Sequence, residues 1–293
     1  MSELQGRLRE NVSLSDYTSW RVGGAAQRLY EPKDSNDLIN FIKQLPPQEP
    51  LLFLGLGSNT LVRDGGINAT VVITQGALCK LDLLSPTLLR AEAGVASPAF
   101  ARFSARKNLS GAEFLAGIPG TIGGALAMNA GCNGMETWEI VHAVEVIDRQ
   151  GKKKIRYPKD YQIAYRNVSV FTDEFFLAGH FQLQPGSKEE SLEKIRALLA
   201  HRTATQPTNE PSCGSVFRNP SGDYAARLIE SCGLKGLKIG GAQVSTKHAN
   251  FIVNEGHATA ADIEALIKKT SDTVLKVHHI QLIPEVHILG SAL

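Results

Sequence analysis

The sequence predicts an α+β protein in two parts, a larger region built on sheets and a smaller α+β module after it. Short apolar runs bounded by turn residues indicate strands, and longer runs with a single apolar stripe indicate helices. The proline-rich segment 206–212 separates the C-terminal part from the rest. With 293 residues, 43% of them hydrophobic, the chain is long and apolar enough to form more than one core.

The elements are expected in a definite order. A short N-terminal helix is followed by a strand near 26–30 and a helix near 35–44 that carries one apolar stripe. Further strands are expected near 51–54, 71–73, 88–93, 142–148, 153–157 and 175–183, and helices near 98–107 and 189–201. After the linker, the module is expected to contain helices at 223–231 and 260–277 and strands near 249–253 and 284–289.

Two glycine-bearing turns, at 55–59 and 117–124, are the most informative motifs. Glycine permits sharp turns and lets successive backbone amides point at an anion. The first turn lacks the third glycine of the dinucleotide fingerprint, and no G-x-x-x-x-G-K-[ST] string occurs, so Rossmann and P-loop sites are excluded. A plain tight turn and close packing of a glycine/alanine segment are the competing interpretations. The two turns together favour a phosphate-bearing cofactor.

Charge and cysteine content limit the partners. The formal net charge of +2 is far from that of a nucleic-acid binder, and Lys152, Lys153 and Lys154 are expected at a solvated hairpin tip. The four cysteines lack C-x-x-C spacing, and the histidines are scattered, so we expect no zinc site, disulfide framework or other metal site. No segment is long and apolar enough to span a membrane. We therefore expect a cytoplasmic protein with no nucleic-acid or membrane partner.

Three residues could carry chemistry, and each has a simpler interpretation. Ser215 lies in a loop rich in polar groups but outside any G-x-S-x-G elbow, and such a serine is more often a turn hydroxyl. Arg166 could offer a fork of donors to a carboxylate, or be a surface arginine paired with an acid. Glu285 is expected on a strand face with His287, and a solvated face is again the simpler interpretation.

Six motifs occur in a fixed order: Gly-Leu-Gly-Ser-Asn at 55–59, Ala-Gly-Ile-Pro-Gly-Thr-Ile-Gly-Gly at 116–124, Tyr-Arg at 165–166, Gly-Ser-Val-Phe-Arg-Asn-Pro at 214–220, Lys-His-Ala-Asn-Phe-Ile-Val-Asn at 247–254 and Pro-Glu-Val at 284–286. In these motifs the chain resembles the UDP-N-acetylenolpyruvoylglucosamine reductases of peptidoglycan synthesis. The resemblance extends from Thr18 to Ile288, and six motifs in order make it specific.

The resemblance implies a two-lobed FAD-binding domain of the vanillyl-alcohol-oxidase type followed by a smaller α+β substrate domain. The implied boundaries are 1–78 with the C-terminal strand 286–293 for lobe 1, 79–204 for lobe 2 and 205–285 for the substrate domain. FAD would lie on both glycine turns, with its pyrophosphate on their amides. The implied cofactor contacts are Gly55, Leu56, Gly57, Ser58, Asn59, Ile118, Pro119, Gly120, Gly123, Gly124 and Asn129.

The resemblance also implies the reaction. NADPH reduces the flavin and leaves, and the enolpyruvyl ether of UDP-N-acetylglucosamine then accepts a hydride at its terminal alkene carbon to give UDP-N-acetylmuramate. Arg166 and Glu285 would stabilise the enolate-like species and Ser215 would protonate it. Tyr165 and Asn219 would contact the substrate. The sequence leaves open the oligomeric state, which is compatible with a monomer, the cation dependence and the preference for NADPH over NADH.

Two departures from the family pattern are visible. Serine often follows the family's Tyr-Arg-Asn, whereas here Val168 comes first and Ser169 sits one residue later, which in a strand changes the face, so Ser169 receives no role. The interval between the arginine and serine motifs is too short for a tyrosine-bearing loop, which indicates the branch without one. Two alternatives remain: another FAD-dependent alcohol or sugar oxidoreductase of the same fold, and a non-catalytic nucleotide-sugar binder.

Overall fold

Contacts between residues divide the chain into two units in the computed structural model, which describes residues 3–293. The first unit consists of 3–10, Arg28–Leu56 and Ala69–Ala200. The second consists of Asn11–Gln27, Gly57–Asn68 and His201–Leu293. Each unit therefore combines segments that lie far apart in the sequence.

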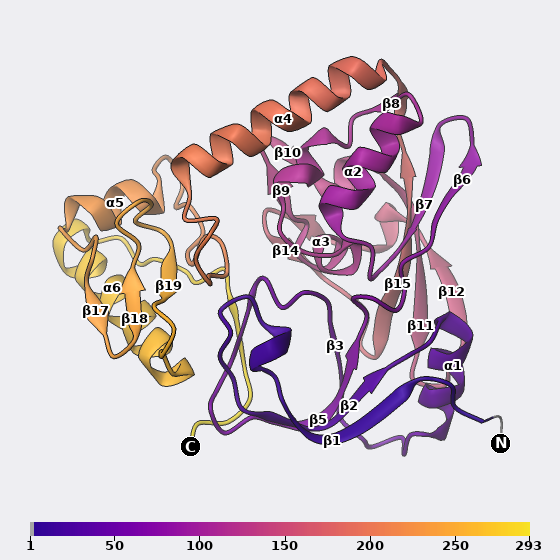
Figure 1. Ribbon diagram of the computed structural model, residues 1–293, viewed down its shortest axis with the longest axis horizontal. Helices are drawn as coiled ribbons and strands as arrows, with labels where there is room; N and C mark the ends of the chain where they lie inside the picture. The colour runs from indigo at the N-terminus through magenta and orange to yellow at the C-terminus, as the bar shows by residue number, and fades with distance from the viewer. Residues whose placement is uncertain (1–2) are drawn as a thin grey trace. The chain divides into compact units, whose positions relative to one another are not determined.

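The first unit is built on a sheet of five antiparallel strands in the order β12-β11-β15-β7-β6 (Figure 1). Their bounds are β6 Leu81–Ser85, β7 Leu88–Glu92, β11 Val141–Asp148, β12 Lys153–Arg156 and β15 Glu174–Gln182. Helices α2 (Ser97–Arg106) and α3 (Ile122–Met128) pack on one face, where Phe100, Leu126 and Phe181 belong to one buried core. The predicted strands β7, β11, β12 and β15 are confirmed, with ends shifted by a residue or two, and β6 was not predicted.

Helix α1 (Ser35–Gln44) packs on the opposite face of this sheet and is confirmed at its predicted ends. Asp34 caps it by accepting hydrogen bonds from the amides of Asn36 and Asp37. The apolar stripe Leu38, Phe41 and Ile42 is buried against Ile147 and Leu177 of the sheet. Strand β3 (Leu51–Leu54) pairs in parallel with β5 (Ile67–Ile73), in a sheet of order β1-β2-β5-β3.

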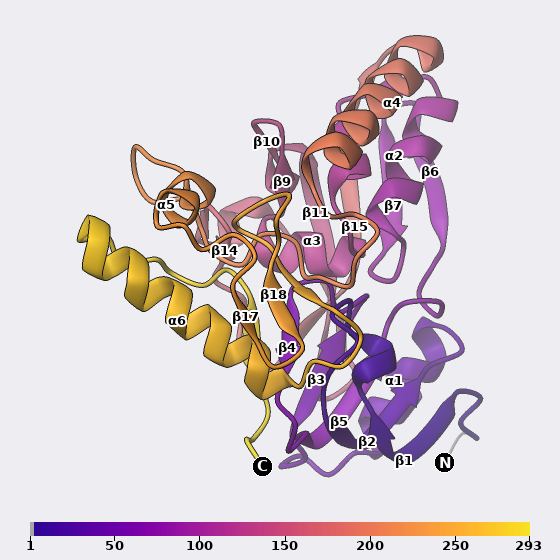
Figure 2. The same ribbon diagram turned by 60° about the vertical axis from the view of Figure 1, so that its left-hand side comes forward.

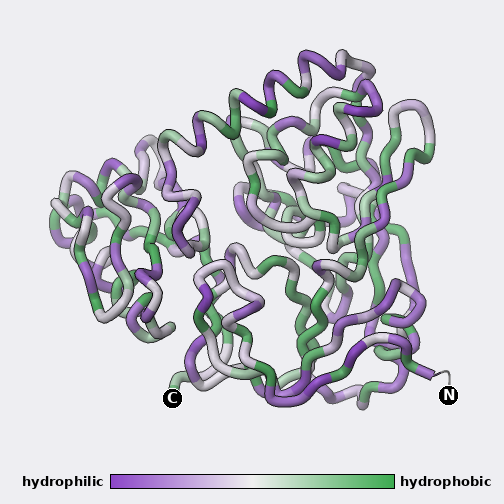
Figure 3. The backbone as a smooth tube through the Cα atoms, in the orientation of Figure 1, coloured by the Kyte–Doolittle hydropathy of each residue, from purple (hydrophilic) through white to green (hydrophobic). Residues whose placement is uncertain are grey.

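The predicted N-terminal helix is wrong, because the chain forms strand β1 (Arg7–Ser13) at the edge of that sheet, next to β2 (Ala25–Glu31). None of the seven residues of β1 is buried, so the segment has no apolar alternation to reveal a strand. Its hydrophilic character is visible in Figure 3. The strand forms because β2 supplies hydrogen-bond partners from outside the segment.

The second unit contains a small antiparallel sheet, β17-β18-β19, with helix α6 (Ala260–His278) lying along it (Figure 2). The strands are β17 Lys238–Ile239, β18 Ala242–Val244 and β19 Ile252–Asn254. α5 (Ala225–Ser231) packs on α6, and a buried core with Trp20, Phe217 and Leu266 holds the unit together. The amides of Ala260 and Ala261 donate to the Asp64 carboxylate at 2.9 Å, which fixes the start of α6.

The predicted strand at 284–289 is shorter in the structure, where β20 spans His287–Leu289. It pairs in parallel with β4 (Thr60–Val62), which immediately follows the first glycine turn and was not predicted. The remaining elements are α4 (Lys188–Thr205), β8 (Leu109–Ser110), β9 (Gly131–Cys132), β10 (Met135–Glu136), β13 (Ile163–Ala164), β14 (Asn167–Val168) and β16 (Gln184–Pro185). None of the helices among residues 3–293 has the length and apolar character needed to cross a membrane.

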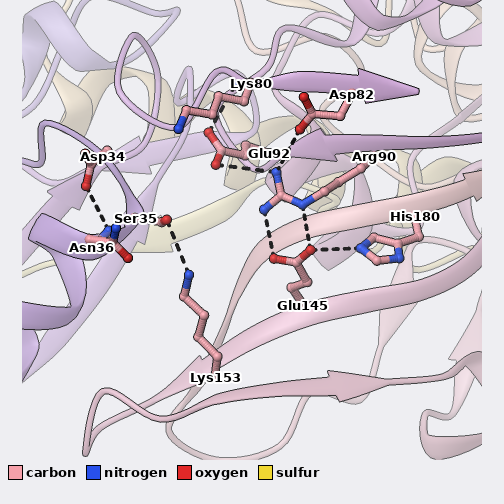
Figure 4. Close-up of polar contacts among 10 residues, drawn as sticks. All are labelled: Asp34, Ser35, Asn36, Lys80, Asp82, Arg90, Glu92, Glu145, Lys153 and His180. Atoms are coloured by element: carbon pink, nitrogen blue, oxygen red, sulfur yellow. Dashed lines mark hydrogen bonds and ion pairs between the residues drawn. The ribbon is translucent and has the colours of Figure 1, made fainter. Parts of the chain in front are cut away.

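A charged network lies on the five-stranded sheet of the first unit (Figure 4). Arg90 makes two hydrogen bonds to Glu145, of 2.6 and 2.8 Å, and His180 Nε2 lies 2.8 Å from the same carboxylate. The side chains of Arg90 and Glu145 are both 16% exposed. The hydrogen bonds from Arg90, followed by that from His180, lower the pKa of Glu145 to about 2.

We expect Glu145→Gln to lower the free energy of unfolding at pH 7 by about 2–4 kcal/mol, because it leaves Arg90 without its main partner. A carboxyl whose pKa is lower in the folded than in the unfolded protein stabilises the fold at any pH above its unfolded-state pKa. This contribution to stability is lost as the pH falls toward the folded-state pKa. Wild type should therefore lose this contribution between pH about 4.5 and about 2, and the variant should not. Urea unfolding from pH 7 to 3 tests this, with Glu193→Gln, at an exposed pair with Arg196, as control. Parallel loss of stability in wild type and Glu145→Gln would contradict it.

Candidate active site

The two glycine turns approach each other in the first unit at Gly55 and Thr121. Gly55 directly follows β3, and Thr121 directly precedes α3. A Cβ placed on Gly55 would lie 2.3 Å from Thr121 Oγ1, so a side chain has no room there. Thr121 is 2% exposed, and its hydroxyl has no hydrogen-bond partner within residues 3–293. A buried hydroxyl without a partner is a position where a bound ligand can supply the missing hydrogen bond.

The glycines of the second turn differ in their surroundings. The Gly123 amide donates to the Ala93 carbonyl at 2.8 Å, and a Cβ on Gly123 would lie 2.9 Å from that of Ala93. Close packing against the end of β7 thus accounts for Gly123. A Cβ on Gly124 would instead meet only Thr121 Oγ1, at 3.9 Å, so the space beside that hydroxyl is open. The predicted cofactor contacts of both glycines stay predictions.

Arg166 lies in the first unit, and other groups fix its guanidinium. It adopts a positive φ of 54° between the two-residue strands β13 and β14. Its Nη1 donates to the Asn129 carbonyl at 3.2 Å and its Nη2 to the Gly131 carbonyl at 2.8 Å. Glu136 lies 3.7 Å from the same group, and Tyr165 stacks on it with 4.7 Å between Cζ and the ring centroid. The predicted substrate contact Tyr165 thus lies directly beside the predicted catalytic arginine.

Asn129 ends α3 in the left-handed conformation and is 1% exposed. Its amide nitrogen donates to Glu136 at 2.7 Å and to the Ala164 carbonyl at 3.2 Å, and its side-chain oxygen accepts from the Trp138 amide. The side chain therefore ties the end of α3 to the turn that carries Arg166. Its predicted contact with a cofactor stays a prediction.

The second unit joins the end of the first glycine turn to Glu285. Gly57 has a φ of 62°, and a Cβ on it would lie 2.2 Å from the Tyr17 carbonyl oxygen. The side-chain amide of Asn59 donates to the backbone oxygen of Glu285 at 3.1 Å, and the Asn59 carbonyl accepts from the His287 amide at 3.0 Å. The Glu285 backbone is thereby held against a turn predicted to bind a cofactor.

The loop that carries Ser215 is hydrogen-bonded to the segment that carries Glu285 in the same unit. The Glu285 amide donates to the carbonyl of Val216 at 2.7 Å, and Phe217 and Pro284 face each other as an antiparallel bridge. Ser215 is half-buried, and Gly214 before it has a φ of 72°. Asn219 is exposed, and its side-chain oxygen accepts from the Ala225 amide at the start of α5. The second unit thus pairs the segment that follows Ser215 with the segment that carries Glu285, although the two residues are seventy positions apart in the sequence.

The cysteine closest to this loop is not an alternative nucleophile. Burial raises the pKa of the Cys213 thiol to about 12, so it stays protonated at neutral pH. Its sulfur lies 3.4 Å from Ser19 Oγ and 3.5 Å from the Thr60 carbonyl oxygen. All four cysteines are free thiols, and no group of three potential metal ligands occurs within residues 3–293. Cys213 therefore helps to pack the glycine turn.

Sequence reasoning missed three residues that shape this site: Thr121, Glu136 and Asn250. Thr121 stands inside the second glycine motif, but only the fold shows that its hydroxyl is buried without a hydrogen-bond partner in the described part of the chain. Asn250 stands in the motif at 247–254, but its hydrogen bonds to Phe217 arise only from folding. Glu136 had no sequence signal, because its contacts with Asn129 and Arg166 arise only from folding.

Comparisons with known proteins match both parts of the chain. Residues 26–154 match the model of an FAD binding domain, and residues 206–289 match that of the UDP-N-acetylenolpyruvoylglucosamine reductase C-terminal domain. A relative of that reductase name from Legionella pneumophila (strain Corby) is 59% identical over 293 residues, covering 100% of this chain and 95% of the relative. One from Methylococcus capsulatus is 54% identical over 288 residues, covering 98% and 95%. The crystal structure of the reductase from Thermus caldophilus superposes with a TM-score of 0.85 at 34% identity, covering 97% of this chain and 100% of that one.

Proposed function

This chain belongs to the UDP-N-acetylenolpyruvoylglucosamine reductase family, and from that membership we propose which of its residues bind the cofactor and which carry the reaction. It is an FAD-dependent oxidoreductase that uses NADPH to reduce the enolpyruvyl ether of UDP-N-acetylglucosamine to UDP-N-acetylmuramate. The predicted fold, an FAD-binding domain followed by a smaller α+β domain, is confirmed. The exact boundaries at 78, 204 and 285 remain part of the proposal.

The first unit offers features that fit FAD. The hydroxyl of Thr121 packs against Gly55 and can donate to a phosphate oxygen, and the missing side chain of Gly124 leaves room beside it. We assign the pyrophosphate to this position. The residues that would hold the cofactor are Gly55, Leu56, Gly57, Ser58, Asn59, Ile118, Pro119, Gly120, Gly123, Gly124 and Asn129, with Thr121 added to the predicted set.

When bound, FAD would supply the hydride, taken from NADPH, that adds to the terminal alkene carbon of the substrate. Negative charge then develops on the carbon that bears the carboxylate, and Arg166 stabilises it. The contacts of Arg166 with the carbonyls of Asn129 and Gly131 and with Glu136 hold the guanidinium before the reaction starts. Such preorganised charge costs no rearrangement during the reaction, which is how enzymes gain most electrostatic stabilisation.

Ser215 completes the reaction by donating its hydroxyl proton to that carbon, and Glu285 stabilises the same species. A serine hydroxyl is a weak acid, but the carbanionic carbon is far more basic, so the transfer is downhill. The observation that carries this assignment is the 2.7 Å hydrogen bond between the Glu285 amide and the Val216 carbonyl, which places the two motifs side by side. Tyr165 and Asn219 are assigned to substrate contacts.

The function is tested by the dependence of NADPH consumption on substrate. The purified protein should show flavin absorbance and should consume NADPH only after the enolpyruvyl ether of UDP-N-acetylglucosamine is added, with UDP-N-acetylmuramate as the product. Oxygen-dependent turnover of an alcohol or sugar would instead indicate another oxidoreductase of the same fold. A colourless protein that binds UDP-sugars even when flavin is supplied would indicate a binding protein. We place the enzyme in the cytoplasm, where its substrates are.

A further inference from the structure

Asn250 belongs to the motif at 247–254, which has no part in the reaction described above. It is 3% exposed, and it hydrogen-bonds to the residues that follow Ser215. Its side-chain oxygen accepts from the Phe217 amide at 3.0 Å, and its side-chain nitrogen donates to the Phe217 carbonyl at 2.8 Å. Its backbone carbonyl accepts from the Val216 amide at 2.9 Å. The side chain therefore pairs with Phe217 as a neighbouring strand would.

The other edge of the same segment pairs with 283–285. Val216 accepts from the Glu285 amide, and the Arg218 amide donates to the Ile283 carbonyl at 3.0 Å. Every backbone amide and carbonyl from the Val216 amide to the Arg218 amide is thus hydrogen-bonded. On the other side of Ser215, Gly214 has a positive φ, and apart from Cys213, Gly214 and Ser215 themselves no residue among 3–293 has an atom within 4 Å of where its Cβ would be. The position of Ser215 is therefore set after the serine by the segment that Asn250 holds, whereas the nearest anchored residue before it is the buried Cys213, on the far side of Gly214.

We propose that Asn250 is a positioning residue for Ser215: it fixes the backbone after the serine and thereby the placement of the hydroxyl that protonates the substrate carbon. This inference rests on the proposed role of Ser215. Catalytic geometry is sensitive on this scale, since a displacement of about 1 Å can cost about 100-fold in rate. Asn250 itself need not touch the substrate.

The first test separates the two half-reactions by stopped-flow absorbance. Asn250→Ala should reduce flavin with NADPH at a rate within about 2-fold of wild type but should slow reoxidation by the sugar nucleotide about 10- to 100-fold. Asn254→Ala is the matched control, because Asn254 is also buried, lies in the same motif, and donates to the Trp20 carbonyl at 2.9 Å, away from the 216–218 segment. Asn254→Ala should lower the stability of the protein but should leave the ratio of the reoxidation rate to the reduction rate unchanged. Equal loss in both half-reactions, or the same selective loss in Asn254→Ala, would overturn the proposal.

Asn250→Asp provides a second variant in case the alanine variant does not fold. Its carboxylate keeps the acceptor for the Phe217 amide but loses the donor to the Phe217 carbonyl. Burial favours the neutral form of the introduced carboxyl, and that form can donate to the carbonyl again. The ratio of the reoxidation rate of Asn250→Asp to that of wild type should therefore rise as the pH is lowered. A ratio that stays constant with pH would count against the proposal.

A double-mutant cycle with Ser215→Ala distinguishes failure of this inference from failure of the proposed function. If Asn250 acts through Ser215, Asn250→Ala should slow reoxidation less than 3-fold or so in the Ser215→Ala background, because the positioned group is gone. An equally large loss in both backgrounds would refute the positioning role and leave Ser215 in place. A Ser215→Ala variant that reoxidises at the wild-type rate would refute the role of Ser215 itself, and with it this inference.

Discussion

Ser215→Ala is expected to leave flavin reduction by NADPH nearly unchanged and to slow the substrate-dependent reoxidation at least about 1,000-fold. The reason is that the first half-reaction needs no proton from the protein, whereas the second ends by protonating a carbon. General-acid catalysis contributes about 100- to 10,000-fold, and Ser215 directly precedes the residue whose carbonyl accepts from the Glu285 amide. Anaerobic stopped-flow absorbance of each half-reaction measures the two rates separately.

Ser212→Ala is the matched control for this prediction. Ser212 is a half-buried serine in the same loop, and its backbone pairs with Val253 in an isolated bridge. Its removal should leave both half-reactions within about 2-fold of wild type, because the substitution leaves the backbone pairing intact. Equal losses of both half-reactions in Ser215→Ala would show that Ser215 holds the loop together and is not the proton donor.

Gly55→Ala has the second-largest expected effect, the loss of FAD binding. The added Cβ would lie 2.3 Å from Thr121 Oγ1, closer than any real contact, so the first glycine turn and Thr121 must move apart. A displaced turn can no longer present its amides to the pyrophosphate, and we expect the Kd for FAD to rise at least about 100-fold. Flavin content of the purified protein and fluorescence titration of the flavin-free protein with FAD test this expectation.

Thr121→Ala separates the steric effect from the loss of a hydrogen bond. Without the hydroxyl, the nearest remaining atom to a Cβ at 55 is the Thr121 Cβ at 3.4 Å, which is ordinary contact. The double variant Gly55→Ala/Thr121→Ala should therefore regain the stability of Thr121→Ala. It should bind FAD about 10-fold more weakly than wild type, since only the hydroxyl contact is missing. Unchanged FAD affinity in Thr121→Ala would show that its hydroxyl does not contact the cofactor.

Local patterns explain why much of the fold could be predicted. α1 was found at its observed ends because Asp34 supplies a cap and Leu38, Phe41 and Ile42 recur at helical spacing. The strands of the five-stranded sheet were found because their apolar runs are bounded by turns. β1 was not predicted, because it has no apolar pattern of its own and depends on pairing with β2. β4 was not predicted, because it depends on pairing with β20, which lies far along the chain.

The site shows the same division between local and long-range information. Ser215, Arg166 and Glu285 are predicted as site residues because each stands in a motif whose order along the chain resembles a known family. Asn250 and Thr121 stand in two of the same motifs, but their proposed roles depend on properties that only folding reveals. Asn250 is hydrogen-bonded to Phe217, and the buried hydroxyl of Thr121 lacks a partner among the described residues. A sequence shows which residue types are present in a motif, whereas the structure shows which of their polar atoms are already used.

Anaerobic reoxidation is the measurement that tests the central claim most directly. The protein is reduced with one equivalent of NADPH without oxygen and is then mixed with the enolpyruvyl ether of UDP-N-acetylglucosamine. We predict that the absorbance of oxidised flavin returns fully and that one equivalent of UDP-N-acetylmuramate forms. A flavin that stays reduced until oxygen is admitted, with no UDP-N-acetylmuramate formed, would contradict the account.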